Sequence, residues 1–268
     1  KIGEIWGYET DGYYTINDFN ADDAKHKTWT LKEGVVKING YNPQPGDVKF
    51  KDLRVDGVIN AGDNTVDNPG DRKVIGNDAA RYQFGISLGA SYKGWSLEVL
   101  LQGVGKRDYW LGGPAMFPFG GAGAGDAVFQ ALYANQTDYW RAKSYDPSSS
   151  DYMVPVNPDS KLFRIYDQGN NVGSNTRVSD KYLQNAAYMR IKNITLAYTL
   201  PKEWVRRAFI QDAKFYLSIE NLATFSSLPK GYDPEGTAPS STANALSNGI
   251  SWGYPYYRTI SLGASITF

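Results

Sequence analysis

The sequence predicts an all-β protein in which five or six antiparallel strands form part of a larger closed sheet. Three observations support this fold class. Apolar and polar residues alternate over several stretches, which is the period of a strand with one apolar face. The connections between these stretches are either very short or very long. No stretch approaches the roughly 18 apolar residues of a membrane-spanning helix, and the mean hydropathy is −0.46.

The clearest strand lies between residues 82 and 92. Every second residue there is apolar, and the residues between them are all small or polar. Eleven residues at about 3.3 Å each can cross a membrane when the strand is tilted. The apolar positions are Tyr82, Phe84, Ile86, Leu88, Ala90 and Tyr92.

Four later stretches alternate in the same way, and residues 4–9 are a possible sixth strand. Pro201 ends one of the strands because proline cannot donate a ladder hydrogen bond, and residues 202–212 are expected to form a short helical turn. If the sheet spans a membrane, all five apolar sets face lipid and the alternate residues face the interior. These sets start at Tyr82, Trp95, Ile194, Phe215 and Ile260.

The lengths of the connections favour a membrane barrel. Lys93-Gly94 and residues 201–212 are short turns, whereas residues 10–81, 105–187 and 224–255 are long connections rich in Gly, Pro, Asn, Asp and Tyr. Short turns on one side and long loops on the other are typical of outer-membrane barrels, in which the long loops are extracellular. An open sheet in lipid would leave unpaired edges, so further chain must close it. The alternative is a soluble β-sandwich with unusual insertions.

The composition excludes several classes of function. The 28 basic and 28 acidic side chains give a formal net charge of zero, whereas a nucleic-acid-binding protein would show a basic excess. There is no cysteine and a single histidine, His26, so neither a thiolate site nor a multi-histidine metal centre is expected. His26 has no identifiable nucleophile partner. Residues 121–125 (GAGAG) lack the Gly-Lys-Ser/Thr ending of a phosphate loop. We therefore expect no enzymatic activity.

Five blocks of sequence, in the same order along the chain, resemble the SusC/RagA-type TonB-dependent transporters of Bacteroidota. Residues 45–59 read PGDVKFKDLRVDGVI, and residues 92–97 with 101–103 read YKGWSL and LQG. Residues 188–201 read YMRIKNITLAYTLP, followed by ENL at 220–222 and GYDPE at 231–235. The last block runs from residue 254 to Phe268. Each block is modest alone, but together they are specific and are spread over most of the chain, from residue 45 to residue 268.

This resemblance implies a transmembrane barrel of about 22 strands, of which residues 1–268 would supply the C-terminal five or six. The plug domain and the remaining strands would then lie outside this chain. The resemblance further implies an importer in the outer membrane of a Gram-negative, Bacteroidota-type cell, coupled to TonB and covered by a SusD-like surface lipoprotein. Its cargo would be oligosaccharides or oligopeptides. The alternative function is a secreted or surface-attached carbohydrate-binding β-sandwich.

One loop overlays a calcium-binding pattern. Residues 52–63 match an EF-hand loop at positions 1, 5, 6, 8, 9 and 12. The predicted ligands are Asp52, Asp56, Asn60 and Asp63, but Arg54 takes the third position, where a carboxylate or amide is expected. The alternative is a charged turn held by side-chain hydrogen bonds. Calcium is the single cofactor that the sequence suggests, and no residues can be assigned to substrate binding.

Two further roles are predicted. Phe268 follows the alternating set Ile260, Leu262, Ala264 and Ile266. An aromatic residue after such a strand is the pattern by which outer-membrane barrels are recognised for assembly, so Phe268 is the expected assembly signal. The aromatic loop residues either stack on sugar rings or, in the favoured interpretation, pack the loops together. They are Tyr109, Trp110, Tyr139, Trp140, Trp252 and Tyr254.

Overall fold

The computed structural model describes residues 2–20, 29–112, 116–117, 132, 134–165, 172–236 and 256–268. His26, residues 121–125, Trp252 and Tyr254, to which the sequence analysis refers, lie outside these ranges. The described chain divides into two compact units. Unit 1 contains residues 2–78 and 109–184, and unit 2 contains residues 79–108, 185–236 and 256–268.

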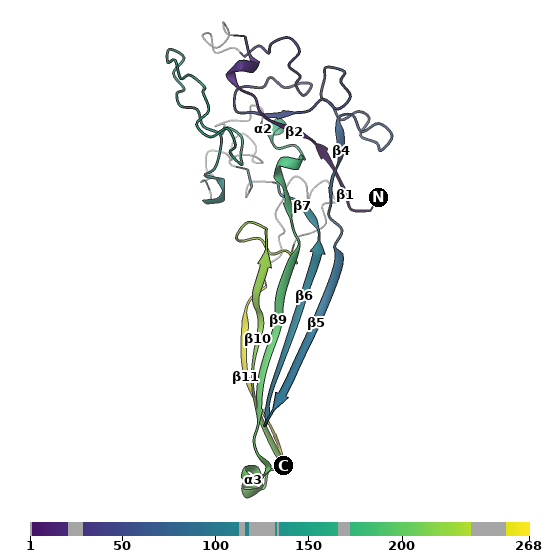
Figure 1. The fold of residues 1–268 in the computed structure, drawn as a ribbon, viewed down its shortest axis with the longest axis vertical. Helices are drawn as coiled ribbons and strands as arrows, with labels where there is room; N and C mark the ends of the chain where they lie inside the picture. The colour runs from purple at the N-terminus through teal and green to yellow at the C-terminus, as the bar shows by residue number, and fades with distance from the viewer. Residues whose placement is uncertain are drawn as a thin grey trace. The chain divides into compact units, whose positions relative to one another are not determined.

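Unit 2 is built on one antiparallel sheet of five strands in the order β11-β10-β9-β6-β5 (Figure 1). The strands are β5 (Arg81–Tyr92), β6 (Trp95–Lys106), β9 (Tyr188–Thr199), β10 (Asp212–Ser226) and β11 (Thr259–Thr267). They are 12, 12, 12, 15 and 9 residues long, and a membrane-spanning strand needs about 9–11. The prediction of five long antiparallel strands is confirmed.

The two predicted short connections have the expected conformations. Lys93 and Gly94 have φ angles of 45° and 87°, and two left-handed residues in a row make the type I′ turn that suits a two-residue hairpin. After Pro201 the chain forms α3 (Lys202–Val205) and the 3-10 turn η5 (Arg206–Ala208). The short helical turn predicted for residues 202–212 is therefore confirmed.

A β-bulge in β9 keeps the apolar residues of this strand on one face of the sheet. Leu100 of β6 pairs with Asn193, whereas the next residue, Leu101, pairs with Ile191. Lys192 is therefore an extra residue in β9, and the strand changes phase by one position there. Without this shift, the apolar residues on either side of the bulge would lie on opposite faces.

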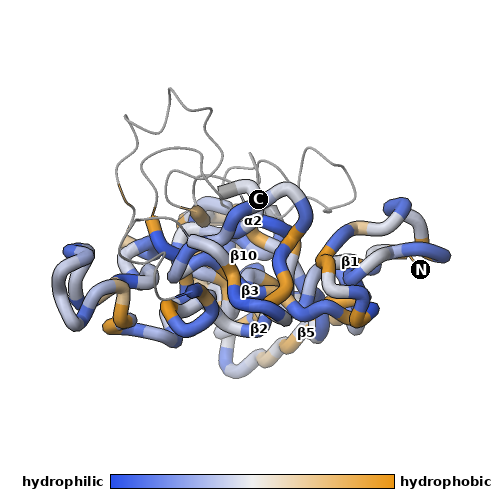
Figure 2. The backbone as a smooth tube through the Cα atoms, turned by 90° about the horizontal axis from the view of Figure 1, so that it is seen from above, coloured by the Kyte–Doolittle hydropathy of each residue, from blue (hydrophilic) through white to orange (hydrophobic). Residues whose placement is uncertain are grey.

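Unit 1 contains short strand pairs around an aromatic core. β1 (Glu4–Tyr8) pairs with β4 (Arg72–Asn77), β2 (Thr10–Tyr13) with β3 (Val48–Phe50), and β7 (Asp108–Trp110) with β8 (Leu183–Asn185). Short helical turns lie between them: η1 (Ile16–Asp18), η3 (Ala134–Gln136), α2 (Val172–Asn175) and η4 (Asp180–Tyr182). Large side chains that are at most 3% exposed fill the core, among them Tyr8, Phe50, Trp110, Phe117, Trp140, Phe163 and Tyr182. In Figure 2, hydrophobic positions recur as short patches along the chain and not as one long run.

Two expectations are corrected by unit 1. The possible sixth strand at residues 4–9 exists as β1, but it pairs with β4 and does not join the five-stranded sheet. Its five residues are too few to span a membrane, and Ile5 and Tyr8 are buried instead. The long connections, which were expected to be loops between the strands of the barrel, contribute strands and core residues to unit 1 within residues 10–78 and 109–184.

None of the helices in the described ranges is long and apolar enough to cross a membrane.

Candidate functional site

One face of the five-stranded sheet is apolar across all of its strands. Residues that pair directly across neighbouring strands share a face, so the register defines rows. The middle row consists of Leu88, Val99, Ile194, Ile219 and Ile260. Its edge members Leu88 and Ile260 are 55% and 64% exposed. A contiguous apolar surface of this extent marks an interaction with lipid or protein.

Aromatic residues mark one end of this apolar face. Tyr92, Trp95, Tyr198 and Phe215 form a row next to the Lys93-Gly94 turn. The rings of Trp95 and Tyr198 have centroids 4.7 Å apart. Eight residues along β5, Phe84 lies in a second row with Met189 and Phe225. The apolar face is thus bounded by larger side chains at both ends.

The opposite face of the sheet is polar. Asn193 donates from Nδ2 to the Ser218 hydroxyl at 3.0 Å, and the Thr195 hydroxyl donates to the Asn193 Oδ1 at 2.8 Å. Tyr216 lies on the same face, with its ring over Gly263 of β11. A Cβ at Gly263 would be 2.1 Å from Cζ of Tyr216, so no larger residue fits there beside this ring.

A buried arginine organises the polar face at the bulge. Arg190 is 2% exposed and donates from Nε to the Thr224 hydroxyl at 2.8 Å and from Nη2 to Asp233 Oδ1 at 2.7 Å. Its Nη1 lies 3.4 Å from Glu235 Oε1. Lys192 donates to Glu235 Oε2 at 2.8 Å. We call Arg190, Lys192, Asp233, Glu235 and Tyr256 the β9 clasp.

The β9 clasp ties both sides of the β10–β11 connection to the sheet. Tyr256 lies under the two cations, with its ring centroid 5.1 Å from the Arg190 guanidinium and 4.5 Å from the Lys192 ammonium. Its backbone N–H donates to Asp233 Oδ2 at 3.2 Å. Residues 233–235 and residue 256 therefore converge on two cations of one strand.

The charge state of the β9 clasp follows from its hydrogen bonds. Burial alone would raise the pKa of Asp233, but the Glu235 backbone N–H and the Arg190 guanidinium bring this pKa below its ordinary value. Asp233 is therefore ionised at neutral pH. A cavity of about 370 Å³ lies beside it, with a lining that includes Arg190, Ser226, Lys230 and Asp233.

The predicted calcium loop is held together by hydrogen bonds from its own backbone. Asp52 accepts from the N–H groups of Val55 and Gly57, both at 2.7 Å. Desolvation alone would raise the pKa of Asp52, but these donors bring it below the ordinary value. The other predicted ligands also accept hydrogen bonds: Asp56 from the Val58 N–H, Asn60 from the Gly62 N–H and Asp63 from the Asn68 amide.

A further carboxylate, which the sequence analysis did not single out, anchors this loop. Asp71 is fully buried and accepts from the backbone N–H groups of Leu53, Arg54 and Asn60 at 2.8–3.1 Å. Within the described ranges, no group of three or more His, Cys, Asp or Glu side chains is placed to hold a metal ion. The side-chain-bonded turn of the alternative interpretation is present, and calcium binding stays a prediction.

The aromatic loop residues that are described pack inside unit 1. Tyr109, Trp110 and Trp140 are 1–3% exposed, and Tyr139 packs against the core in which Trp110 and Trp140 lie. The favoured interpretation, loop packing, is confirmed for these four residues.

Three curated relatives from Formosa agariphila are similar to the chain in sequence. TonB-dependent receptor P3 is 26% identical over 272 residues, which cover 100% of this chain and 22% of the receptor. Receptor P26 is 24% identical and covers 90% of this chain and 22% of its own length. Receptor P39 is 25% identical, and the match covers 100% of this chain and 25% of the receptor. No family model matches the chain.

Two solved structures share its fold. The RagAB peptide importer in the open-open state has a TM-score of 0.52 at 19% identity, covering 99% of this chain and 22% of the solved chain. The RagAB peptide transporter has a TM-score of 0.50 at 18% identity, and the match covers 100% of this chain and 23% of the solved chain. The chain resembles SusC/RagA-type TonB-dependent transporters over its whole length. It spans between a fifth and a quarter of the length of these proteins.

The SusC/RagA-type resemblance confirms the fold class but says little about the β9 clasp. Residues 188–201 and 231–235 both belong to the family-like blocks, but nothing in their sequences indicates that their charged side chains pair. Arg190 and Asp233 are 43 residues apart in sequence, and a strand pattern carries no information about such a partner. The one signal in the sequence was the break in alternation at Lys192 and Asn193.

Proposed function

We propose that this chain is part of the wall of a TonB-dependent nutrient importer in the outer membrane of a Bacteroidota-type cell. The continuous apolar face of β5, β6, β9, β10 and β11 would contact lipid, and the polar face would line the interior. The remaining barrel strands and the plug would come from polypeptide beyond these 268 residues and pair with the edges β5 and β11.

The observation that carries this proposal is the height of the apolar face. The Tyr92 and Phe84 rows are eight residues apart on β5, which is roughly 27 Å along a strand. At a tilt of about 40° this corresponds to roughly 21 Å across the membrane, close to the apolar band of about 25 Å on outer-membrane barrels. The aromatic residues then lie at the interfaces, where Tyr and Trp are enriched.

The same arrangement supports an orientation. The Lys93-Gly94 turn and the α3 connection are the short links typical of the periplasmic side. The long connections would then be extracellular, where a SusD-like lipoprotein would cover the entrance. TonB would drive uptake, and the cargo would be oligosaccharides or oligopeptides. The solved relatives named RagAB import or transport peptides, which supports the peptide class for this chain.

Deletion of the whole gene in the parent bacterium tests the proposal. We expect the deletion strain to lose growth on at least one oligosaccharide or oligopeptide supplied as the sole carbon source, and the intact gene to restore it. A protonophore should abolish uptake of that cargo in the complemented strain. Recovery of the protein in a soluble secreted fraction, together with unchanged growth on every cargo, would favour the carbohydrate-binding β-sandwich instead.

Two site proposals accompany this function. We propose that Phe268, which is 81% exposed beyond the apolar residues of β11, is read as an assembly signal. We also propose that Asp52, Asp56, Asn60 and Asp63 bind calcium and stiffen the loop between β3 and β4, although Asp52 would have to exchange its backbone donors for the ion.

A further inference from the structure

The turn after β9 holds an aromatic ring in an unusual position. The Phe209 N–H donates to the Arg206 carbonyl and the Ile210 N–H donates to the Val205 carbonyl, which is the Schellman ending of a helix. This motif needs a left-handed residue, usually glycine, and here it is Phe209 with a φ of 59°. Its side chain is 94% exposed. The fold of this turn gains nothing from the ring, since glycine would fit the backbone with less strain.

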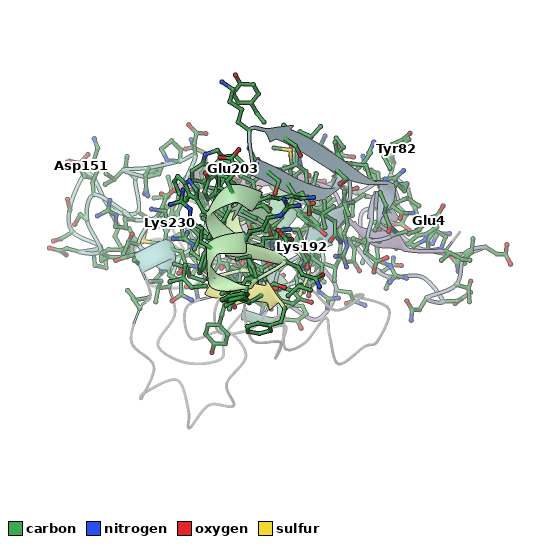
Figure 3. All side chains as sticks on the ribbon, turned by 90° about the horizontal axis from the view of Figure 1, so that it is seen from below. Glu4, Tyr82, Asp151, Lys192, Glu203 and Lys230 are labelled. Carbon is green, nitrogen blue, oxygen red and sulfur yellow. The ribbon has the colours of Figure 1, made fainter. Side chains whose placement is uncertain are left out.

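The rest of the turn is exposed in the same way. Trp204 is 63% exposed, whereas Val205 between the helical residues is 4% exposed and anchors the turn. Lys202, Arg206 and Arg207 are exposed beside them. Figure 3 views the chain from the side of this turn, with Glu203 labelled on α3. Two large aromatic rings and three cations are thus presented together by the eight residues 202–209, which form α3, η5 and the residue that follows them.

The turn connects two strands at the end of the sheet that carries the aromatic row. Tyr198, in the aromatic row, is four residues before Lys202, and Phe215 of the same row is six residues after Phe209. Lys93 adds a cation at this end, with its ammonium 5.2 Å from the ring centroid of Tyr92. The described turns at this end of the sheet, residues 93–94 and 200–211, therefore contain four basic residues (Lys93, Lys202, Arg206 and Arg207) and one acidic residue (Glu203).

We propose that the α3 turn is a lipid-binding surface that inserts Trp204 and Phe209 at the membrane interface and binds anionic phospholipid headgroups through Arg206 and Arg207. Aromatic rings are favoured at this depth, and cations next to a membrane surface attract anionic lipids. The exposed ring of Phe209 and its left-handed backbone are then explained by the contact with lipid. This inference rests on the proposed membrane location of the sheet.

Nitroxide labels on the full-length transporter, in a background free of other cysteines, test this surface. The labels are placed at residue 209, at Leu88 in the apolar middle row and at Val66, which is 74% exposed in unit 1. The protein is reconstituted in vesicles of phosphatidylcholine with 30% phosphatidylglycerol. We expect the ratio of oxygen to water-soluble nickel accessibility at residue 209 to lie between those of Leu88 and Val66, and several-fold above that of Val66.

The reference labels separate the two ways in which this test can fail. If the accessibility ratio of the Leu88 label is typical of lipid but that of the residue 209 label equals that of Val66, the α3 turn does not bind lipid, although the sheet lies in the membrane. The turn would then be available to a periplasmic protein. Equal, aqueous values at Leu88 and Val66 would overturn the membrane location as well.

Two variants test the roles of the ring and of the cations. Phe209→Gly should unfold at a higher temperature than wild type in detergent, because strain is relieved, and at a lower temperature in the vesicles, because the ring contact is lost. A change of the same sign in both media would overturn the role of the ring. Omitting phosphatidylglycerol should make the residue 209 label shallower in wild type but not in the Arg206→Gln, Arg207→Gln double variant. If the depth of the residue 209 label is the same with and without phosphatidylglycerol when Arg206 and Arg207 are present, the proposed contact with anionic headgroups is wrong.

Discussion

Replacing Arg190 with methionine should open the β9 clasp while leaving the sheet in place. The change removes a guanidinium that is 2% exposed and leaves Asp233 and Glu235, at 11% and 10% side-chain exposure, without their shared cation. Removing one partner of a buried pair typically costs about 3–5 kcal/mol. Asp233 keeps two backbone donors and Glu235 keeps its ion pair with Lys192. We therefore expect the closed clasp to lose about 3 kcal/mol of stability, the lower end of this range.

This loss corresponds to a roughly 100-fold higher population of the open clasp. Limited proteolysis of the full-length protein in detergent measures it, because cleavage near residues 227–236 follows the population of the open form. We expect cleavage to be about 100-fold faster in Arg190→Met. The double variant Arg190→Met, Asp233→Asn should recover part of the protection, because the unpaired charge is gone.

The clasp should also respond to pH. The pKa of Asp233 is lowered by folding, so its contribution is complete above the ordinary carboxyl pKa and is lost as the pH falls below it. Wild-type protection should therefore weaken below about pH 4, and Arg190→Met should show less of this dependence, because only the backbone donors of Glu235 and Tyr256 still lower the pKa of Asp233. Cleavage of Arg190→Met at the wild-type rate at neutral pH would show that Arg190 does not hold the β10–β11 connection against the sheet.

Three other predictions concern the membrane face, the last strand and the loop. Ile194→Arg, in the middle row, should destabilise the folded barrel in vesicles by about 2–4 kcal/mol, whereas Phe215→Arg, in the aromatic row, should cost about 0–1 kcal/mol; equal losses in a denaturant titration would contradict the depth assignment. Deleting Phe268 should lower the amount of barrel inserted in cells without lowering the unfolding temperature of barrels already folded, and unchanged insertion would leave it a merely interfacial residue. Calorimetric titration with calcium should release heat with wild type and less with Asp56→Ala; identical traces would mean that the loop is only a turn.

The strands were predictable where one phase of alternation runs unbroken. Residues 82–92 read as a strand because a single face is apolar throughout, and the structure extends β5 by only one residue. In β9, the alternation changes phase at Lys192, so the pattern predicted only the part from Asn193 onward. The structure starts the strand at Tyr188. A bulge shifts the alternation by one residue, so a search for one fixed period does not follow the strand through it.

Unit 1 was not predictable from alternation. Its strands are three to six residues long, which is too short for a period to show, and its core gathers aromatic residues from distant segments such as Tyr8, Phe50 and Tyr182. The anchoring role of Asp71 was hidden for the same reason. It depends on three backbone N–H groups 11 to 18 residues away, and the sequence around Asp71 does not indicate which groups these are.

Adjacent labels on opposite faces of the sheet decide whether the five strands form a membrane wall with one face in lipid. Nitroxides at Leu88 and Ile260 lie in the middle row of the apolar face, and their neighbours Ser87 and Ser261 lie on the polar face of the edge strands β5 and β11. In the full-length protein in lipid vesicles, a lipid-soluble quencher should reach Leu88 and Ile260 and largely spare Ser87 and Ser261. Equal accessibility within each pair would mean that the sheet does not have one face in lipid.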